Sequence, residues 1–323
     1  MLALARGAIA RSVIASVGDM PAAEPRPLAP AVLRRPAFSA YVASIRYPEA
    51  LVLQGSPLLG AAFALHEITA AKILLGALFA VASFLLVAHI WSFNDWAGAT
   101  ADLNDPNKAP GVFSTRGVSP RGFLGFSFLL LAASLALFAF LPARTFLIAV
   151  AIAALGILYS HPALSAKTIP VLSSLPHLAG GLLHFLLGYS VYEVIDSRGL
   201  LIALFFALTF AAGHLNQEVR DCAGDRANGL CTSAVVFGPT RVFAASVLLF
   251  TFAYADLVLL AYARIVPTIL GLLPLVLYPL QLVWSVQTLR AGLDFESVVR
   301  VQTRYRLLYA LIGVSMLVAL ALR

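Results

Sequence analysis

Charged residues are scarce in this sequence of 323 residues, where Asp, Glu, Lys and Arg together make up 11%. About a quarter of the residues in a soluble domain are charged, so a soluble globular protein is excluded. Hydrophobic residues reach 61% and the mean hydropathy is +0.91. The lipid bilayer is therefore the expected solvent. The composition shows no break that would mark a second folded domain.

Cysteine is also scarce, since the chain has only Cys222 and Cys231. With neither a second cysteine pair nor a histidine cluster beside them, a zinc site is not expected, and both are predicted to be free thiols facing a reducing cytosol. The pI is about 9.7, but the basic residues are spread along the chain and form no stripe. We therefore predict no nucleic-acid partner, and expect membrane lipids and anionic substrates instead.

The first forty residues lack any apolar stretch long enough for a signal peptide or a spanning helix, because Arg6 and Arg11 interrupt them. Residues 21–36 contain five prolines, which predict an extended linker. We expect residues 1–40 to form a flexible amphipathic and proline-rich tail. A surface helix, a misassigned start and a transit peptide remain alternatives. Residues 41–323 are expected to form one helical membrane domain.

Nine apolar runs of about twenty residues follow the tail, the length that a hydrocarbon core about 30 Å thick requires of a helix. They predict an all-α membrane protein, a bundle of nine transmembrane helices with helix-end caps over a central cavity. Gly55, Ser56 and Pro57 interrupt the first run. The runs are residues 49–66, 71–93, 122–141, 144–160, 171–192, 199–216, 241–262, 266–288 and 304–322.

The basic residues predict the orientation of these helices. With the N-terminus inside, 17 of the 22 lysines and arginines fall on the cytoplasmic side, as the positive-inside rule requires. We therefore expect an integral membrane protein, of a bacterial inner membrane, with a cytoplasmic N-terminus and an external C-terminus. The joints that carry the polar residues described next lie on the cytoplasmic side.

Two polar clusters follow the second and the sixth apolar runs. The first, FNDWAGATADLNDPNK, places Asn94, Gly98 and Asp102 at i, i+4 and i+8, with Asp95 and Asp105 nearby. The second, HLNQEVRDCAGDRANG, places Gln217, Asp221 and Asp225 at the same spacing. If each helix continues beyond the bilayer, each set shares one helical face. The matching positions indicate an internal quasi-repeat.

Carboxylates one helical turn apart repel each other unless a cation lies between them. Mg²⁺ prefers one or two carboxylates together with phosphate oxygens and water, so two facing clusters predict a magnesium-bridged diphosphate. Basic residues accompany both clusters and a third polar joint, YSHPALSAK. They are Lys108, Arg116, Lys167, Arg220 and Arg226. The alternative is that these acids are ordinary solvated residues at helix ends.

Together these motifs resemble the UbiA-type intramembrane prenyltransferases, over about residues 40 to 320. The resemblance is carried by the order of the motifs on a nine-helix frame. It implies that Asn94, Asp95, Asp102, Asp221 and Asp225 bind metal, and that Tyr159 and Lys167, with Asp221 and Asp225, are catalytic. It also implies diphosphate binding by a basic set, Lys108, Arg116, Lys167 and Arg220.

The chain departs from the family pattern at two positions. Gly98 stands where the family has the central aspartate of the first motif, and Ser165 stands where the family often has arginine. The first change removes a carboxylate from the shared helical face. One metal is then held more weakly or differently, with Asp95 or Asp105 as candidate replacements, and an altered or lost activity is left open.

The resemblance implies an Mg²⁺-dependent enzyme that moves a polyprenyl group from a prenyl diphosphate to a lipophilic or aromatic acceptor. Positive charge neutralises the leaving diphosphate, and an acceptor carbon captures the allylic cation. One alternative is a membrane terpene cyclase that quenches the same cation internally. Another is a non-catalytic lipid-binding or transport protein, but transporters place their functional groups near the midplane and not at helix ends.

Overall fold

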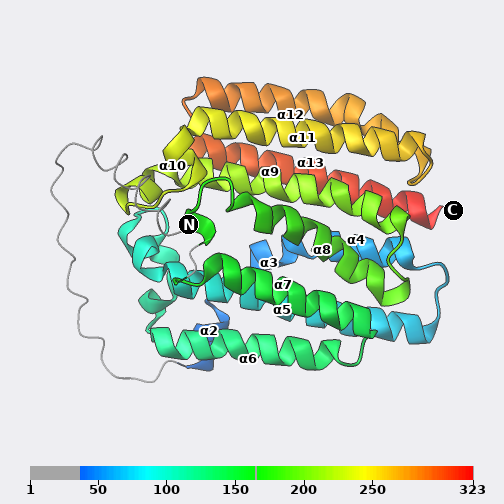
Figure 1. The fold of residues 1–323 in the computed structure, drawn as a ribbon, viewed down its shortest axis with the longest axis horizontal. Helices are drawn as coiled ribbons and strands as arrows, with labels where there is room; N and C mark the ends of the chain where they lie inside the picture. Colours follow the sequence, from blue (N-terminus) through cyan, green and yellow to red (C-terminus); the bar gives the residue numbers. More distant parts are fainter. Residues whose placement is uncertain (1–36, 164–165, 323) are drawn as a thin grey trace, which may run out of the picture. The chain divides into compact units, whose positions relative to one another are not determined.

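The computed structural model describes residues 37–163 and 166–322, and within these ranges it contains helices and no strand (Figure 1). The all-α prediction is confirmed for this part of the chain. The predicted tail lies almost entirely outside the described residues. The α-helices are α2 (Phe38–Val42), α3 (Tyr47–Leu53), α4 (Gly55–Ala64), α5 (Ala70–Asn104), α6 (Pro120–Phe138), α7 (Ala143–Ser160), α8 (Ser174–Tyr192), α9 (Ser197–Ala227), α10 (Ser233–Phe237), α11 (Pro239–Tyr262), α12 (Leu273–Arg290) and α13 (Phe295–Ala321).

Seven helical segments in the described part of the chain are long and apolar enough to cross a membrane. They are α5, α6, α7, α9, α11, α12 with the 3-10 turn that precedes it, and α13. Large apolar side chains such as Leu74, Leu129 and Val276 lie exposed on them, which is expected where lipid replaces water as the solvent. The chain is an integral membrane protein.

The two remaining predicted spans correspond to helices outside this set of seven. The run at 49–66 is divided at the buried Gln54 into α3 and α4, close to the predicted interruption. The run at 171–192 corresponds to α8, which carries His177 and His184. The count of nine spanning helices therefore stays a prediction.

The helices form two groups on either side of α4 and α8 (Figure 1). One group contains α9, α11, α12 and α13, and the other contains α5, α6 and α7. The α4–α8 contact is especially close, because a Cβ atom on Gly188 would overlap the carbonyl oxygen of Pro57, and one on Gly60 would overlap that of Phe185. Small residues let two backbones approach in this way. Their packing fixes the distance between the two groups.

Candidate functional site

A polar cavity lies at the end of the bundle where α5 and α9 finish. Its lining contains most of the residues predicted from the sequence: Asn94, Asp102, Lys108, Tyr159, Lys167, Arg220, Asp221 and Asp225. The structure thus brings together both polar clusters and the YSHPALSAK joint. We call Asp102, Asp221 and Asp225 the acidic cluster.

Both polar clusters lie on helices that continue well beyond their apolar segments. α5 has 35 residues and ends at Asn104, and α9 has 31 residues and ends at Ala227. Positions 94, 98 and 102 therefore lie within one α-helix, and so do positions 217, 221 and 225. Each set shares one helical face, as expected, because i, i+4 and i+8 positions lie one above another on an α-helix.

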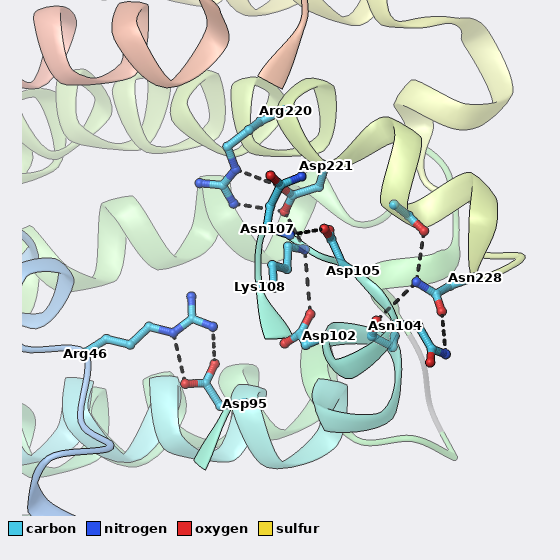
Figure 2. Close-up of polar contacts among 12 residues, drawn as sticks. Arg46, Asp95, Asp102, Asn104, Asp105, Asn107, Lys108, Arg220, Asp221 and Asn228 are labelled. Atoms are coloured by element: carbon cyan, nitrogen blue, oxygen red, sulfur yellow. Dashed lines mark hydrogen bonds and ion pairs between the residues drawn. The ribbon is translucent and has the colours of Figure 1, made fainter. Parts of the chain in front are cut away.

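The C-terminal ends of α5 and α9 are hydrogen-bonded directly to each other (Figure 2). Asn228, the C-cap of α9, donates to the backbone oxygen of Ala101 at 3.2 Å and accepts a hydrogen bond from Asn104 at 3.2 Å. Asp105 is buried against α9, and a Cβ atom on Gly224 would lie 2.5 Å from its Oδ2. Glycine at position 224 therefore permits this approach.

Lys108 lies between the two polar clusters (Figure 2). Its Nζ is 2.9 Å from Oδ2 of Asp221 and 3.7 Å from Oδ1 of Asp102. Burial opposes its charged form, but the Asp221 carboxylate raises the pKa of the Lys108 ammonium above its ordinary value. The ammonium is therefore a fixed positive charge that joins the two aspartate motifs.

Lys167 approaches the place where the first cluster lacks a carboxylate. A Cβ atom built on Gly98 would lie 3.6 Å from Nζ of Lys167 and 3.4 Å from Oδ2 of Asp102, both ordinary contact distances. Burial lowers the pKa of the Lys167 ammonium, while Asp102 and Asp225 counteract that effect. A Cβ atom would fit at 98, but glycine places no carboxylate beside this ammonium.

Two predicted site residues do not line the polar cavity. Both carboxylate oxygens of Asp95 contact Arg46, with Nε to Oδ2 at 2.9 Å and Nη2 to Oδ1 at 2.6 Å (Figure 2). Arg116 is exposed, donates to the carbonyl oxygen of Gly111 and lines a neighbouring cavity together with Asp95. Asp105, the other candidate replacement for the missing carboxylate, does line the polar cavity, and its Oδ1 accepts the backbone N–H of Asn107 at 2.9 Å.

Two other predicted residues have fixed partners in the cavity wall. Asn94 donates to Oγ of Ser160 at 3.1 Å, so this hydrogen bond does not use its side-chain oxygen, the only atom of the amide that could bind a metal. Arg220 donates both Nε and Nη2 to Asp221, at 2.6 Å and 2.9 Å. This two-pronged contact with its chain neighbour orients the Asp221 carboxylate toward Lys108.

The cavity also contains residues to which the sequence pattern assigned no site role or a minor one. They are Arg46, Glu49, His177, His214, Gln217, Glu218 and Arg306. The rings of His177 and His214 stack with centroids 3.6 Å apart. Gln217 and Glu218 were visible in the second motif, but no sequence pattern links α8 to α9 through a histidine pair.

The donor set decides whether magnesium fits this cavity. In the described ranges no group of three or more His, Cys, Asp or Glu side chains is arranged to hold a metal ion. The acidic cluster nevertheless supplies hard carboxylate oxygens from both motif helices at one cavity, which are the ligands that Mg²⁺ takes together with phosphate oxygens. The residues therefore fit a metal that arrives with a phosphate ligand, and they would hold it through Asp102, Asp221 and Asp225.

Apolar cavities adjoin the polar one. One between α3–α4 and α13 is lined mostly by aliphatic and aromatic side chains, including Leu51, Phe210 and Leu317. A smaller cavity shares Trp91 and His214 with the polar cavity and Arg306 with both. A long apolar chain attached to a phosphate group would therefore find a polar and an apolar compartment side by side.

These features define a class, namely helical membrane proteins with a carboxylate-lined and lysine-lined cavity at one end of the bundle. Residues 56–321 match the UbiA prenyltransferase family, and the chain belongs to that family. The resemblance inferred from the sequence motifs is thereby confirmed.

Relatives of the chain agree with this assignment. A digeranylgeranylglyceryl phosphate synthase of Halobacterium salinarum is 35% identical over 169 residues, 51% of this chain, and the match spans 58% of the relative. A UbiA homologue from Archaeoglobus fulgidus bound to DMAPP and Mg²⁺ has a TM-score of 0.70 at 18% identity, covering 88% of this chain and 100% of that one. The same protein bound to GPP and Mg²⁺ has a TM-score of 0.67 at 18% identity, covering 86% and 99%.

Proposed function

We propose that this chain is an Mg²⁺-dependent prenyltransferase that moves a prenyl group from a prenyl diphosphate to an acceptor within the membrane. The observation that carries the proposal is the polar cavity, where carboxylates of α5 and α9 meet Lys108 and Lys167. The family assignment supports it, as do the neighbouring structures that contain DMAPP or GPP with Mg²⁺.

The residues divide into two roles in this proposal. Asp102, Asp221 and Asp225 hold the metal, with Asn94 as a further oxygen ligand, because they line the cavity from both motif helices. Lys108, Lys167 and Arg220 bind the diphosphate oxygens. Asp95 as a metal ligand and Arg116 as a diphosphate contact stay predictions, and the first would require Asp95 to leave its pair with Arg46.

Ionisation of the donor is the demanding step. When bound, Mg²⁺ stabilises negative charge on the departing diphosphate. Lys108 and Lys167 add positive charge in the same cavity, and electrostatic interactions are stronger in a partly desolvated site. Tyr159 lies at the boundary of the polar and apolar cavities, with its ring edge-on to that of His177 at 4.8 Å. We therefore assign it a catalytic role next to the bound donor.

The comparisons support the prenyl diphosphate donor more strongly than any particular acceptor. The curated relative, of which the chain covers 58%, is a synthase of digeranylgeranylglyceryl phosphate, so a prenylated glyceryl phosphate is our first candidate. The aromatic acceptor stays a prediction that no relative supports. The experiment should therefore offer both acceptor classes.

Purified protein in lipid nanodiscs would be given Mg²⁺ and geranylgeranyl diphosphate, with a prenylglyceryl phosphate or 4-hydroxybenzoate as acceptor. Product and diphosphate would be quantified. We expect Asp221→Asn and Asp225→Asn to lower diphosphate release by about 100-fold or more, because even outer partners of a bound metal contribute about 10–100-fold. Asp196→Asn, at the opposite end of α9, serves as the control. Equal release by wild type and Asp221→Asn would contradict the proposal.

A further inference from the structure

The chain's own cations already lie against the acidic cluster. Three carboxylates, Asp102, Asp221 and Asp225, share the cavity with Lys108, Lys167 and Arg220. Lys108 reaches both motifs, and Arg220 holds Asp221 with two hydrogen bonds. Across the whole cavity lining, six carboxylates, which also include Glu49, Asp105 and Glu218, lie among five lysines and arginines, which also include Arg46 and Arg306. The opposite charges nearly balance, so the Coulombic attraction for an added cation is small.

Gly98 lies beside the second lysine. The place of a Cβ atom at 98 lies between Oδ2 of Asp102, at 3.4 Å, and Nζ of Lys167, at 3.6 Å. A carboxylate on that side chain would add negative charge beside the lysine. The chain has none there, and the acids that act most strongly on the ammonium of Lys167 are Asp102 and Asp225.

On the basis of the proposed function, we infer that Lys108 and Lys167 are resident counter-cations of the acidic cluster, so that the chain takes up Mg²⁺ together with a diphosphate and not before it. Without a diphosphate, a divalent ion would have to displace Lys108 from Asp221 and lie beside uncompensated ammonium groups. A diphosphate offers the lysines new oxygen partners, and a flexible four-carbon stem allows each lysine to reach them. The carboxylates are then released for the metal.

Metal binding without diphosphate tests this inference. The full chain in nanodiscs would be titrated with Mn²⁺, a paramagnetic substitute for Mg²⁺, and the bound fraction read by electron paramagnetic resonance. A charge within about 4–6 Å changes the proton affinity of a carboxylate by about 10- to 1000-fold. We therefore expect Lys108→Met and Lys167→Met to raise the Mn²⁺ affinity by about tenfold or more. Lys72→Met, outside the polar cavity, should leave it unchanged.

Gly98→Asp provides an independent variant, because it adds a carboxylate and keeps both lysines. The space beside Gly98 accepts a Cβ atom, and aspartate is less unfavourable than glycine within a helix. This variant should also bind Mn²⁺ more tightly without diphosphate. Affinities equal to wild type in all three variants would overturn the inference.

A second measurement separates this inference from the proposed function. Retention of radiolabelled inorganic diphosphate by the protein would be measured with and without Mn²⁺. Wild type should retain diphosphate only with Mn²⁺, and Lys108→Met should retain less. If wild type retains neither ligand, the proposed function fails as well. If wild type retains both but binds Mn²⁺ equally well alone, only the counter-cation inference fails.

Discussion

The Arg46–Asp95 pair joins residues that are 49 positions apart in the sequence. Asp95 begins the first polar cluster, but its side chain turns away from the acidic cluster toward the loop before α3. The Arg46 guanidinium also lies 5.3 Å from the centroid of the Trp91 ring. This pair therefore anchors the start of α3 to α5.

We expect Arg46→Met to destabilise the protein by about 1–3 kcal/mol, the usual effect of leaving a buried acceptor without its partner. Thermal unfolding in detergent would measure the loss. Arg46→Met combined with Asp95→Asn should lose less than the sum of the two single variants, because each single change leaves one partner alone. Strictly additive losses would show that the pair contributes nothing.

Glu218 lies beside the catalytic candidates, but its carboxylate is bound by groups from other helices and has a structural role. It accepts a hydrogen bond from Oγ of Ser173 at 2.7 Å and one from the backbone N–H of Ala234 at 3.3 Å. Its Oε1 is 3.1 Å from Nε2 of His214. One buried side chain thus connects α9 to the start of α8 and to α10.

Replacing Glu218 with Ala should therefore lower the thermal stability, by about 1–3 kcal/mol, because it leaves buried donors unsatisfied. Glu218→Gln keeps an acceptor oxygen and should retain part of the stability. Differential scanning fluorimetry would measure the melting temperatures of both variants. An unchanged melting temperature for Glu218→Ala would contradict the structural role of Glu218.

Among the helices, the α4–α8 contact depends on two glycines. Gly188→Ala should destabilise the bundle by about 1–3 kcal/mol, the range for overpacking, because its Cβ atom would overlap the backbone of α4. Gly125→Ala on α6 is the matched control, since no heavy atom lies within 4 Å of its Cβ position. That variant should be neutral or slightly stabilising. Equal melting temperatures for the two would contradict the close packing.

The start of α9 depends on its N-cap, Asp196. The carboxylate accepts the backbone N–H of Gly199 at 2.8 Å and the hydroxyl of Tyr189 at 3.0 Å. The Gly199 hydrogen bond, and then the Tyr189 hydroxyl, lower the pKa of Asp196 below its ordinary value. Such a cap stabilises the fold above the unfolded pKa of about 3.9, and the effect is lost as the pH falls through the folded value.

Asp196→Ala should consequently cost about 1 kcal/mol at pH 7. The difference from wild type should begin to shrink below about pH 4, where the unfolded chain starts to bind the proton, and should disappear once the folded carboxylate is also protonated. Asp196→Asn keeps an acceptor and should behave like wild type at pH 7. Melting curves at pH 7 and at pH 3.5 would test the sign, and a difference that grows in acid would contradict it.

For the whole molecule, the basic residues predict that the site end faces the cytoplasm. A chain with Cys222→Ala and Cys231→Ala would receive either Thr115→Cys, near the site, or Ala263→Cys, at the far end of α11. Both positions are exposed. An impermeant maleimide should label Ala263→Cys in intact cells and Thr115→Cys only after permeabilisation. The reverse pattern would overturn the orientation.

The apolar runs mark the membrane spans and do not mark where the helices begin and end. The apolar runs end at residues 93 and 216, but α5 continues to Asn104 and α9 to Ala227. Likewise α13 begins at Phe295, nine residues before its apolar run. Hydropathy reports where lipid ends, whereas backbone hydrogen bonds continue as long as caps and neighbours support them.

The sequence by itself determined the membrane solvent, the helical class, the family and most members of the acidic and basic sets, because apolar length and residue spacing are local properties. Only the tertiary structure decided that Asp95 pairs with Arg46, that Lys108 lies between Asp102 and Asp221, and that Lys167 approaches Gly98. Charge pairing depends on which side chains the packed helices bring within a few ångströms of each other, and spacing along the chain does not specify that distance.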